Sequence, residues 1–231
     1  MRHIHLDRII SHESPPKAIK IFSEKEIKMI QELFQTLPER TFNKKQNIRK
    51  KAWVQNYNKE LDKIYFDKLK DAIGDFKMDT LKSKKGEDFY GLFHESFSPL
   101  KLHVDSGFDE NDIIYKQVVT PLSPFGDTVI FKNRWYGRST SFTIEEDELN
   151  FQPKPGQNDR SNQHLSAGNF DETLHKKYLT HINIKNLRGL KIDLVYNWKI
   201  GETLIMDRSH IHSSSSRIKE KKLGLTTFTK K

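Results

Sequence analysis

Apolar positions in the first third of the chain recur at helical spacing. Ser23 and Glu26 stand three residues apart, the capping-box form that opens a helix. The apolar positions that follow are Ile27, Ile30, Leu33 and Phe34, and Leu37-Pro38 ends the run. A second amphipathic helix is expected over about 59–76. Both stripes predict faces that pack against a sheet. Residues 1–22 are expected to be irregular.

Beyond residue 86 the pattern changes from helical to extended. The strand-like runs are 89–95, 116–121, 128–131, 192–200, 203–206 and 223–229, and a short helix is expected over 171–179. The runs at 116–121 and 128–131 flank a turn at Phe125-Gly126-Asp127 and are interpreted as an antiparallel hairpin. Two helices followed by many short strands predict an α+β, mainly β chain. Its expected core is a jelly roll or double-stranded β-helix buttressed by the N-terminal helices.

The chain is predicted to be a single domain spanning residues 1–231, because no linker interrupts it. Residues 1–85 are expected to be mainly helical, and residues 86–231 to form the jelly-roll core. Residues 134–170 are rich in Ser, Asn, Gln and Asp and carry several Gly and Pro. An insertion of this kind is interpreted as a flap beside the active site, with a neutral surface loop as the alternative.

Composition narrows the class of protein. The formal net charge is +9, but the basic cluster at 44–51 is interpreted as a solvated loop, since no nucleic-acid-binding motif accompanies it. The chain contains no Cys, which excludes disulfides and thiolate metal sites. Neither a signal peptide nor an apolar run of about 18 residues is present, so we expect a cytoplasmic protein without a membrane partner. The oligomeric state is not predicted.

The candidate chemistry centres on His103-Val104-Asp105. Residues two apart in an extended strand point to the same side, so His103 and Asp105 can offer one nitrogen and one oxygen to a metal ion. His5-Leu6-Asp7 has the same form but no strand-like surroundings. Two His with one carboxylate is the ligand set of the facial triad of non-haem Fe(II) oxygenases.

From about residue 90 to 229, the order of features resembles the Fe(II)/2-oxoglutarate-dependent oxygenase superfamily. The resembling pattern is His-x-Asp, then a late His, then a basic residue on the following strand. The resemblance implies that His103, Asp105 and His212 bind iron. His210 shares parity with His212 and is the alternative third ligand; the family-like spacing from Gly201 favours His212.

The resemblance also assigns the cosubstrate site. Lys222 lies ten residues after His212, where the family places the cation for the distal carboxylate of 2-oxoglutarate. In an extended strand Lys222, Gly224 and Thr226 share one face, so Thr226 could add a hydroxyl. Arg217 is the rival anchor, because Arg pairs with carboxylates through two parallel bonds.

The implied activity is a dioxygenase reaction with Fe(II), 2-oxoglutarate and O2. It would hydroxylate an unactivated C–H bond and release succinate and CO2. A small molecule or an amino-acid or peptide side chain is the expected substrate; possible pocket residues are Phe131, Trp135, Tyr136, Arg134, Arg138 and Arg160. Nucleic-acid demethylation is the alternative within the superfamily. A non-catalytic jelly-roll binding protein is the alternative outside it.

Overall fold

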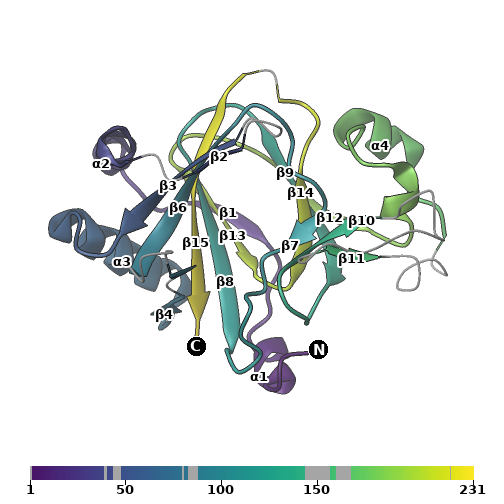
Figure 1. The fold of residues 1–231 in the computed structure, drawn as a ribbon, viewed down its shortest axis with the longest axis horizontal. Coiled ribbons are helices and arrows are strands. Elements are labelled where there is room, and N and C mark those ends of the chain that lie inside the picture. Colours follow the sequence, from purple (N-terminus) through teal and green to yellow (C-terminus); the bar gives the residue numbers. More distant parts are fainter. Residues whose placement is uncertain are drawn as a thin grey trace.

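Two mainly antiparallel β-sheets face each other in the computed structural model of this chain (Figure 1). The structure describes residues 2–38, 41–43, 48–79, 81–82, 88–143, 157–159, 168–218 and 220–231. The larger sheet has the strand order β1-β13-β8-β15-β6-β3-β2, with β4 paired to β15 and β5 to β6. The smaller sheet has the order β11-β10-β7-β14-β9-β12. This arrangement confirms the predicted jelly-roll class.

The strands of the larger sheet are β1 (Lys17–Lys20), β2 (Thr41–Asn43), β3 (Ile48–Val54), β4 (Lys77–Met78), β5 (Leu81–Lys82), β6 (Asp88–Ser96), β8 (Ile114–Pro121), β13 (Glu202–Asp207) and β15 (Lys222–Lys230). Those of the smaller sheet are β7 (His103–Val104), β9 (Asp127–Arg134), β10 (Thr140–Thr143), β11 (Gln157–Asp159), β12 (Ile192–Asn197) and β14 (His210–Ser214).

Two helices cover the outer face of the larger sheet (Figure 1). Helix α2 (Glu24–Thr36) begins at the predicted capping box, in which Ser23 and Glu26 exchange side-chain and backbone hydrogen bonds. Helix α3 (Lys59–Ile73) starts at an Asn58 cap and ends before Gly74, whose φ is 76°. It is therefore shorter than predicted at its C-terminal end, because Gly74 leaves the helical conformation.

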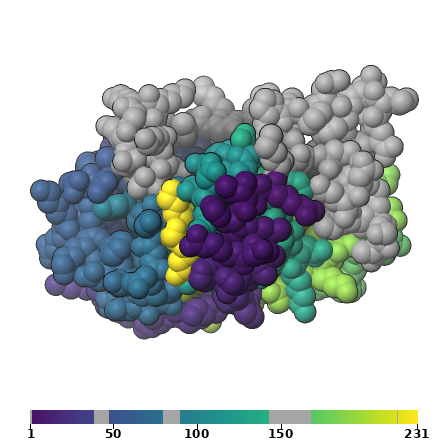
Figure 2. All heavy atoms as spheres, turned by 90° about the horizontal axis from the view of Figure 1, so that it is seen from below, coloured from purple at the N-terminus to yellow at the C-terminus, as the bar shows by residue number. Residues whose placement is uncertain are grey.

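The N-terminal segment is more ordered than the sequence indicates. It forms helix α1 (Leu6–Ile10) and strand β1, which extends the larger sheet beside β13. Figure 2 shows these residues lying over the middle of the lower face, beside the C-terminal strand. Backbone bonds from His3 to Tyr136 and from Ile4 to Glu110 hold the segment there. These long-range pairings explain why a local pattern did not predict the segment.

Side-chain alternation divides the core into three layers. On β14, Ile211 packs outward in a cluster with residues around helix α4 (Glu172–Tyr178) and the 3-10 helix η2 (Ile184–Leu187), whereas His212 points between the sheets. On β8, Val118 faces the helices and Val119 faces the smaller sheet. The space between the sheets therefore receives both polar side chains and an apolar cluster around Trp198, and members of both line one cavity.

The hairpin predicted for 116–121 and 128–131 is wrong. Strand β8 pairs with β13 and β15 in the larger sheet, and β9 pairs with β12 and β14 in the smaller one. The turn between them carries the chain from one sheet to the other. Strands β13 and β14 are divided in the same way, since the chain crosses between the sheets at Arg208-Ser209.

The predicted flap at 134–170 falls partly outside the described residues. Its described portions include the end of β9, the strands β10 and β11, which pair in parallel, and residues 168–170. The flap and the single-domain organisation therefore stay predictions. Within the described ranges, no helix combines the length and apolarity needed to span a lipid bilayer.

Candidate active site

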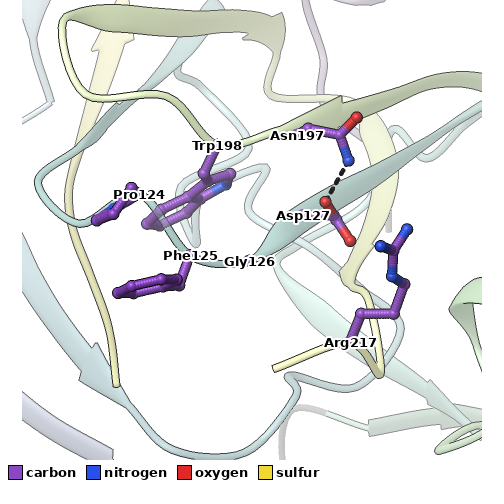
Figure 3. A pocket seen from close by; sticks show the side chains of 7 residues that line it. All are labelled: Pro124, Phe125, Gly126, Asp127, Asn197, Trp198 and Arg217. Atoms are coloured by element: carbon purple, nitrogen blue, oxygen red, sulfur yellow. Dashed lines mark hydrogen bonds between the residues drawn. The ribbon is translucent and has the colours of Figure 1, made fainter. Parts of the chain in front are cut away.

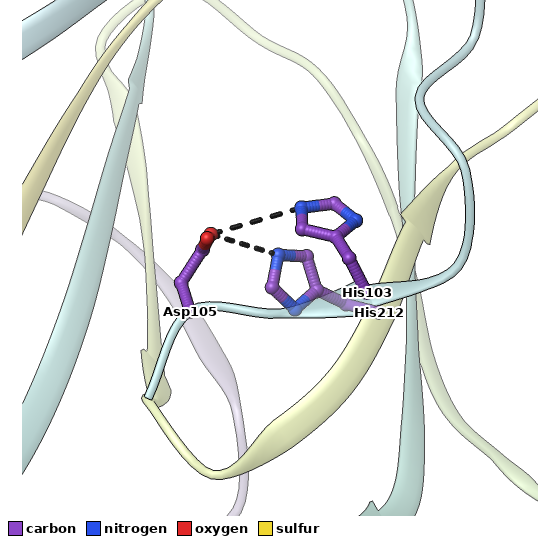
Figure 4. A group of neighbouring side chains, drawn as sticks. All are labelled: His103, Asp105 and His212. Carbon is purple, nitrogen blue, oxygen red and sulfur yellow. Dashed lines mark ion pairs between the residues drawn. The ribbon is translucent and has the colours of Figure 1, made fainter. Parts of the chain in front are cut away.

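His103, Asp105 and His212 converge between the two sheets (Figure 4). His103 on β7 is the direct cross-strand partner of His212 on β14, and their ring centroids lie 4.2 Å apart. Asp105 follows β7 and turns its carboxylate toward both rings. Its Oδ2 is 3.7 Å from Nε2 of His103 and 3.5 Å from Nε2 of His212. One ligand atom from each residue lies within 4.8 Å of the others, which matches a donor set for a single metal ion.

The backbone sets the orientation of both imidazoles. Nδ1 of His103 is 2.6 Å from the carbonyl oxygen of Lys101, and Nδ1 of His212 is 3.0 Å from that of His210. A carbonyl oxygen can only accept, so each Nδ1 carries the proton. Each Nε2 then presents its lone pair to the centre of the cluster. Such backbone bonds fix the tautomer that a metal ligand needs.

Asp105 is held by a third partner. Nε2 of Gln117, on β8 of the larger sheet, donates to Oδ2 of Asp105 over 2.9 Å. Burial alone would raise the pKa of Asp105, but the neighbouring imidazoles of His103 and His212 and the hydrogen bond from Gln117 hold it well below its usual range. Burial lowers the pKa of His103 to about 4, and His212 adds to the shift. At neutral pH the cluster is therefore an ionised carboxylate with a neutral His103, a state ready to bind a metal ion.

His210 does not join this cluster. Its Nδ1 accepts a hydrogen bond from the backbone N–H of Asp207 over 3.1 Å, and its side chain is buried away from His103 and Asp105. Strand β14 shows a register irregularity between His210 and His212. Although His210 and His212 are two residues apart, their rings therefore do not point to the same site.

A cavity of about 530 Å³ contains the three clustered residues and Lys222. Lys222 is 5% exposed, and its Nζ lies 3.8 Å from the ring centroid of Trp198 and 3.4 Å from the carbonyl oxygen of Asp127. Burial lowers the pKa of Lys222 to about 7, while the charge of Asp127 opposes the shift. A buried ammonium with so few partners is costly, and a bound carboxylate would offset that cost.

The two other predicted cosubstrate residues lie on different sides of this region. Thr226 lines the same cavity as Lys222. Arg217 instead lines a separate cavity of about 210 Å³ with Asp127, Asn197 and Trp198, as Figure 3 shows. Trp198 borders both cavities, with Lys222 on the side of the clustered His and Asp. The structure thus brings Lys222 and Thr226, but not Arg217, to the cavity of the cluster.

Two further polar residues of the cavity went unrecognised in the sequence, Lys50 and His94. The interpretation of 44–51 as a solvated loop is wrong for residues 48–51, which belong to β3; residues 44–47 lie outside the described residues. The signal was Lys50 itself, which stands between the apolar Ile48 and Ala52 at inward-facing spacing.

The described aromatic and basic residues that were expected to line a substrate pocket pack or form polar contacts elsewhere. Phe131 and Trp135 belong to the outer apolar cluster, and Tyr136 donates to Glu13. Arg134 pairs with Asp207, and Arg138 with Glu110. None of these five lines the cavity of His103 and His212. Arg160 lies outside the described residues.

Comparisons with known proteins find similarity at the level of structure. No protein-family model and no curated protein sequence matches this chain significantly. A 2OG-Fe(II) oxygenase family oxidoreductase from Burkholderia pseudomallei aligns with a TM-score of 0.51 and 11% identity, covering 97% of this chain and 89% of its own. HygX from Streptomyces hygroscopicus, with nickel, 2-oxoglutarate and hygromycin B bound, has a TM-score of 0.51 and 12% identity, covering 98% and 86%.

A third similar structure is the non-haem alpha-ketoglutarate-dependent carbocyclase SnoK from nogalamycin biosynthesis. It aligns with a TM-score of 0.55 and 8% identity, covering 100% of this chain and 86% of its own. Together with the described strand order, these alignments define the class: this chain has the double-stranded β-helix fold of the Fe(II)/2-oxoglutarate-dependent oxygenases. The predicted resemblance to this superfamily is confirmed at the level of the fold.

Proposed function

We propose that this chain is an Fe(II)- and 2-oxoglutarate-dependent dioxygenase that hydroxylates a C–H bond of a small molecule or of an amino-acid or peptide substrate. The observation that carries the proposal is the convergence of two imidazoles and one carboxylate at the wall of a cavity that also holds a buried ammonium with few partners. The fold similarity to enzymes of this reaction class supports it.

Each residue of the site has a proposed role. His103, Asp105 and His212 would hold Fe(II) on one face and leave the opposite face open. Lys222 would pair with the distal carboxylate of 2-oxoglutarate, and Thr226 would add a hydroxyl beside it. When bound, iron and cosubstrate would supply O2 reduction coupled to decarboxylation to succinate and CO2. Trp198 lines the cavity beside Lys222, and its ring would hold the ammonium in place for the cosubstrate.

Anaerobic titration with Fe(II) and then 2-oxoglutarate tests the proposal. We expect a weak visible charge-transfer band that needs both additions. The Asp105→Ala protein should lose the band, whereas Asp193→Ala, which removes an exposed carboxylate from β12, should keep it. Folded wild-type protein that gives no band would overturn the proposal in favour of a non-catalytic binding protein.

The demethylase alternative makes a separate prediction. It requires turnover of 2-oxoglutarate that rises when methylated oligonucleotides are added, whereas our proposal expects them to leave turnover unchanged. Succinate formation measured with and without such oligonucleotides separates the two. Stimulation by the oligonucleotide that is lost in Asp105→Ala would favour the alternative.

A further inference from the structure

Besides Lys222 and the exposed Lys101, the cavity is lined by Lys50, for which neither the metal cluster nor the cosubstrate accounts. Lys50 lies on β3, opposite His94 of β6, which in turn lies opposite Gly224 of β15. Both Lys50 and His94 line the cavity wall. The neighbouring Lys51 points the other way, because its Nζ donates to the carbonyl oxygen of Phe34 at the end of α2. Strand alternation therefore aims Lys50, and not Lys51, into the site.

The side-chain nitrogens of Lys50 and His94 are available to bind a ligand. Among the described residues, the side chains of Lys50 and His94 have no hydrogen-bond or ion-pair partner. Burial lowers the pKa of Lys50, and burial followed by the Lys50 charge lowers the pKa of His94 to about 3. His94 is thus a neutral ring beside an ammonium. A half-buried ammonium and a neutral N–H donor without partners form a pair suited to one anionic group.

The charge balance of the cavity supports the same conclusion. Its charged lining residues, histidines aside, are Lys50, Lys101, Lys222 and Asp105. The charges of a divalent metal ion and a dianionic cosubstrate cancel, and the single carboxylate of Asp105 offsets one of the three lysines. The lining therefore keeps a net positive charge, to which the half-buried Lys50 contributes. A loaded site of this composition attracts an anion rather than a cation or a neutral molecule.

We propose that Lys50 and His94 form a substrate subsite that binds a carboxylate or phosphate group, so that the substrates of this site are small anionic molecules. The inference rests on the proposed function and specifies its substrate class. The cavity volume of about 530 Å³ lies within the range of small-molecule sites, roughly 300–1,000 Å³. Lys222 remains the cosubstrate anchor, and Lys50 orients the molecule to be oxidised.

Inorganic phosphate serves as the probe in a direct binding experiment. The protein is loaded with Mn(II) and 2-oxoglutarate at constant ionic strength, and phosphorus-31 relaxation reports phosphate near the paramagnetic ion. We expect saturable relaxation in the wild type and about a tenfold loss of phosphate affinity in Lys50→Gln. Lys50→Arg should retain most of the affinity. The matched control Lys51→Gln removes the same charge from the same strand and should leave it unchanged.

The outcomes separate this inference from the proposed function. Normal metal and 2-oxoglutarate binding with no Lys50-dependent phosphate relaxation would overturn the subsite alone. A loss of 2-oxoglutarate affinity in Lys50→Gln, with Lys222→Gln unaffected, would make Lys50 the cosubstrate anchor and also overturn it. Failure of the wild type to bind metal and 2-oxoglutarate would reject the proposed function, and the subsite with it.

Discussion

His212 lies directly opposite His103 in the pairing of β14 with β7, and both rings turn Nε2 toward Asp105. Cross-strand neighbours in an antiparallel pair have their side chains on one face, so the sheet register itself sets the spacing of two ligands. Asp105 reaches the same point because it follows His103 by two residues. The candidate metal cluster is thus built on two neighbouring strands of one sheet.

This register distinguishes His212 from His210 in a metal-binding experiment. We expect His212→Ala to weaken Fe(II) or Co(II) binding by more than about 100-fold, because a ligand contributes more than the outer partners whose loss costs about 10–100-fold. His210→Ala should leave metal affinity within a few fold, since its ring faces Asp207. Calorimetric titration of both folded variants checks the difference. The reverse order would identify His210 as the ligand.

Gln117 is expected to act on metal binding through Asp105. Its amide N–H fixes one carboxylate oxygen, so Gln117→Leu should weaken metal binding by about 10–100-fold while the protein stays folded. Gln31→Leu is the matched control, because it removes an amide that donates to the carbonyl oxygen of Leu122, away from the cavity. Equal metal affinity in Gln117→Leu and the wild type would show that Asp105 needs no such support.

The affinity for 2-oxoglutarate should depend on pH through Lys222. Its pKa of about 7 in the free protein means that the ammonium is protonated below pH 7 and increasingly neutral above it. Binding a carboxylate favours the charged form, so above pH 7 binding must take up a proton. The apparent Kd should therefore rise with pH, by at most about tenfold per unit above 7. Titrations of metal-loaded protein between pH 6 and 9 measure this.

Two variants test whether Lys222 causes that dependence. Lys222→Arg should bind 2-oxoglutarate without the rise, because a guanidinium stays charged over this range. Arg217→Gln should behave like the wild type, since Arg217 lines the other cavity. A wild-type Kd that is flat from pH 6 to 9, or a large loss of affinity in Arg217→Gln, would contradict the assignment of Lys222.

The sequence predicted which residues share one face of a strand better than it predicted which strands belong to the same sheet. Period-two spacing placed His103 with Asp105 and Lys222 with Thr226 on common faces, and the structure agrees. Sheet membership depends on pairing between distant segments, which local alternation does not encode. For this reason the hairpin expected around Phe125 proved to be a crossing between sheets.

The same limit explains the missed and misplaced cavity residues. Lys50 lies more than 50 residues before His103, and only the pairing of β3 with β6 brings it to the cavity. Arg217 follows the last β14 residue by three positions, yet it lines the smaller cavity on the other side of Trp198. Arg217 was recognised as a candidate anchor, whereas Lys50 was assigned to a loop. In neither case did the sequence show which cavity the side chain lines.

Gly224 gives the sharpest test of how packing supports the cosubstrate site. A Cβ at this position would lie 2.5 Å from Cη2 of Trp198, closer than real contacts allow. Glycine therefore leaves room for the indole of Trp198. The Lys222 ammonium lies over this ring, and the indole N–H donates to the hydroxyl of Thr128. We expect Gly224→Ala to displace Trp198, cost about 1–3 kcal/mol of stability through overpacking, and weaken 2-oxoglutarate binding while metal affinity persists.

Gly91→Ala provides a matched control on the same sheet. An added Cβ there would lie 2.7 Å from Cδ1 of Leu225, which packs in the layer under the helices. It should cost similar stability, because it also overpacks a buried contact, but it should leave 2-oxoglutarate affinity unchanged. Thermal unfolding and anaerobic 2-oxoglutarate titration of both variants measure the two effects separately. If both variants lost cosubstrate affinity equally, the effect would come from general destabilisation, and Trp198 would have no particular role in positioning Lys222.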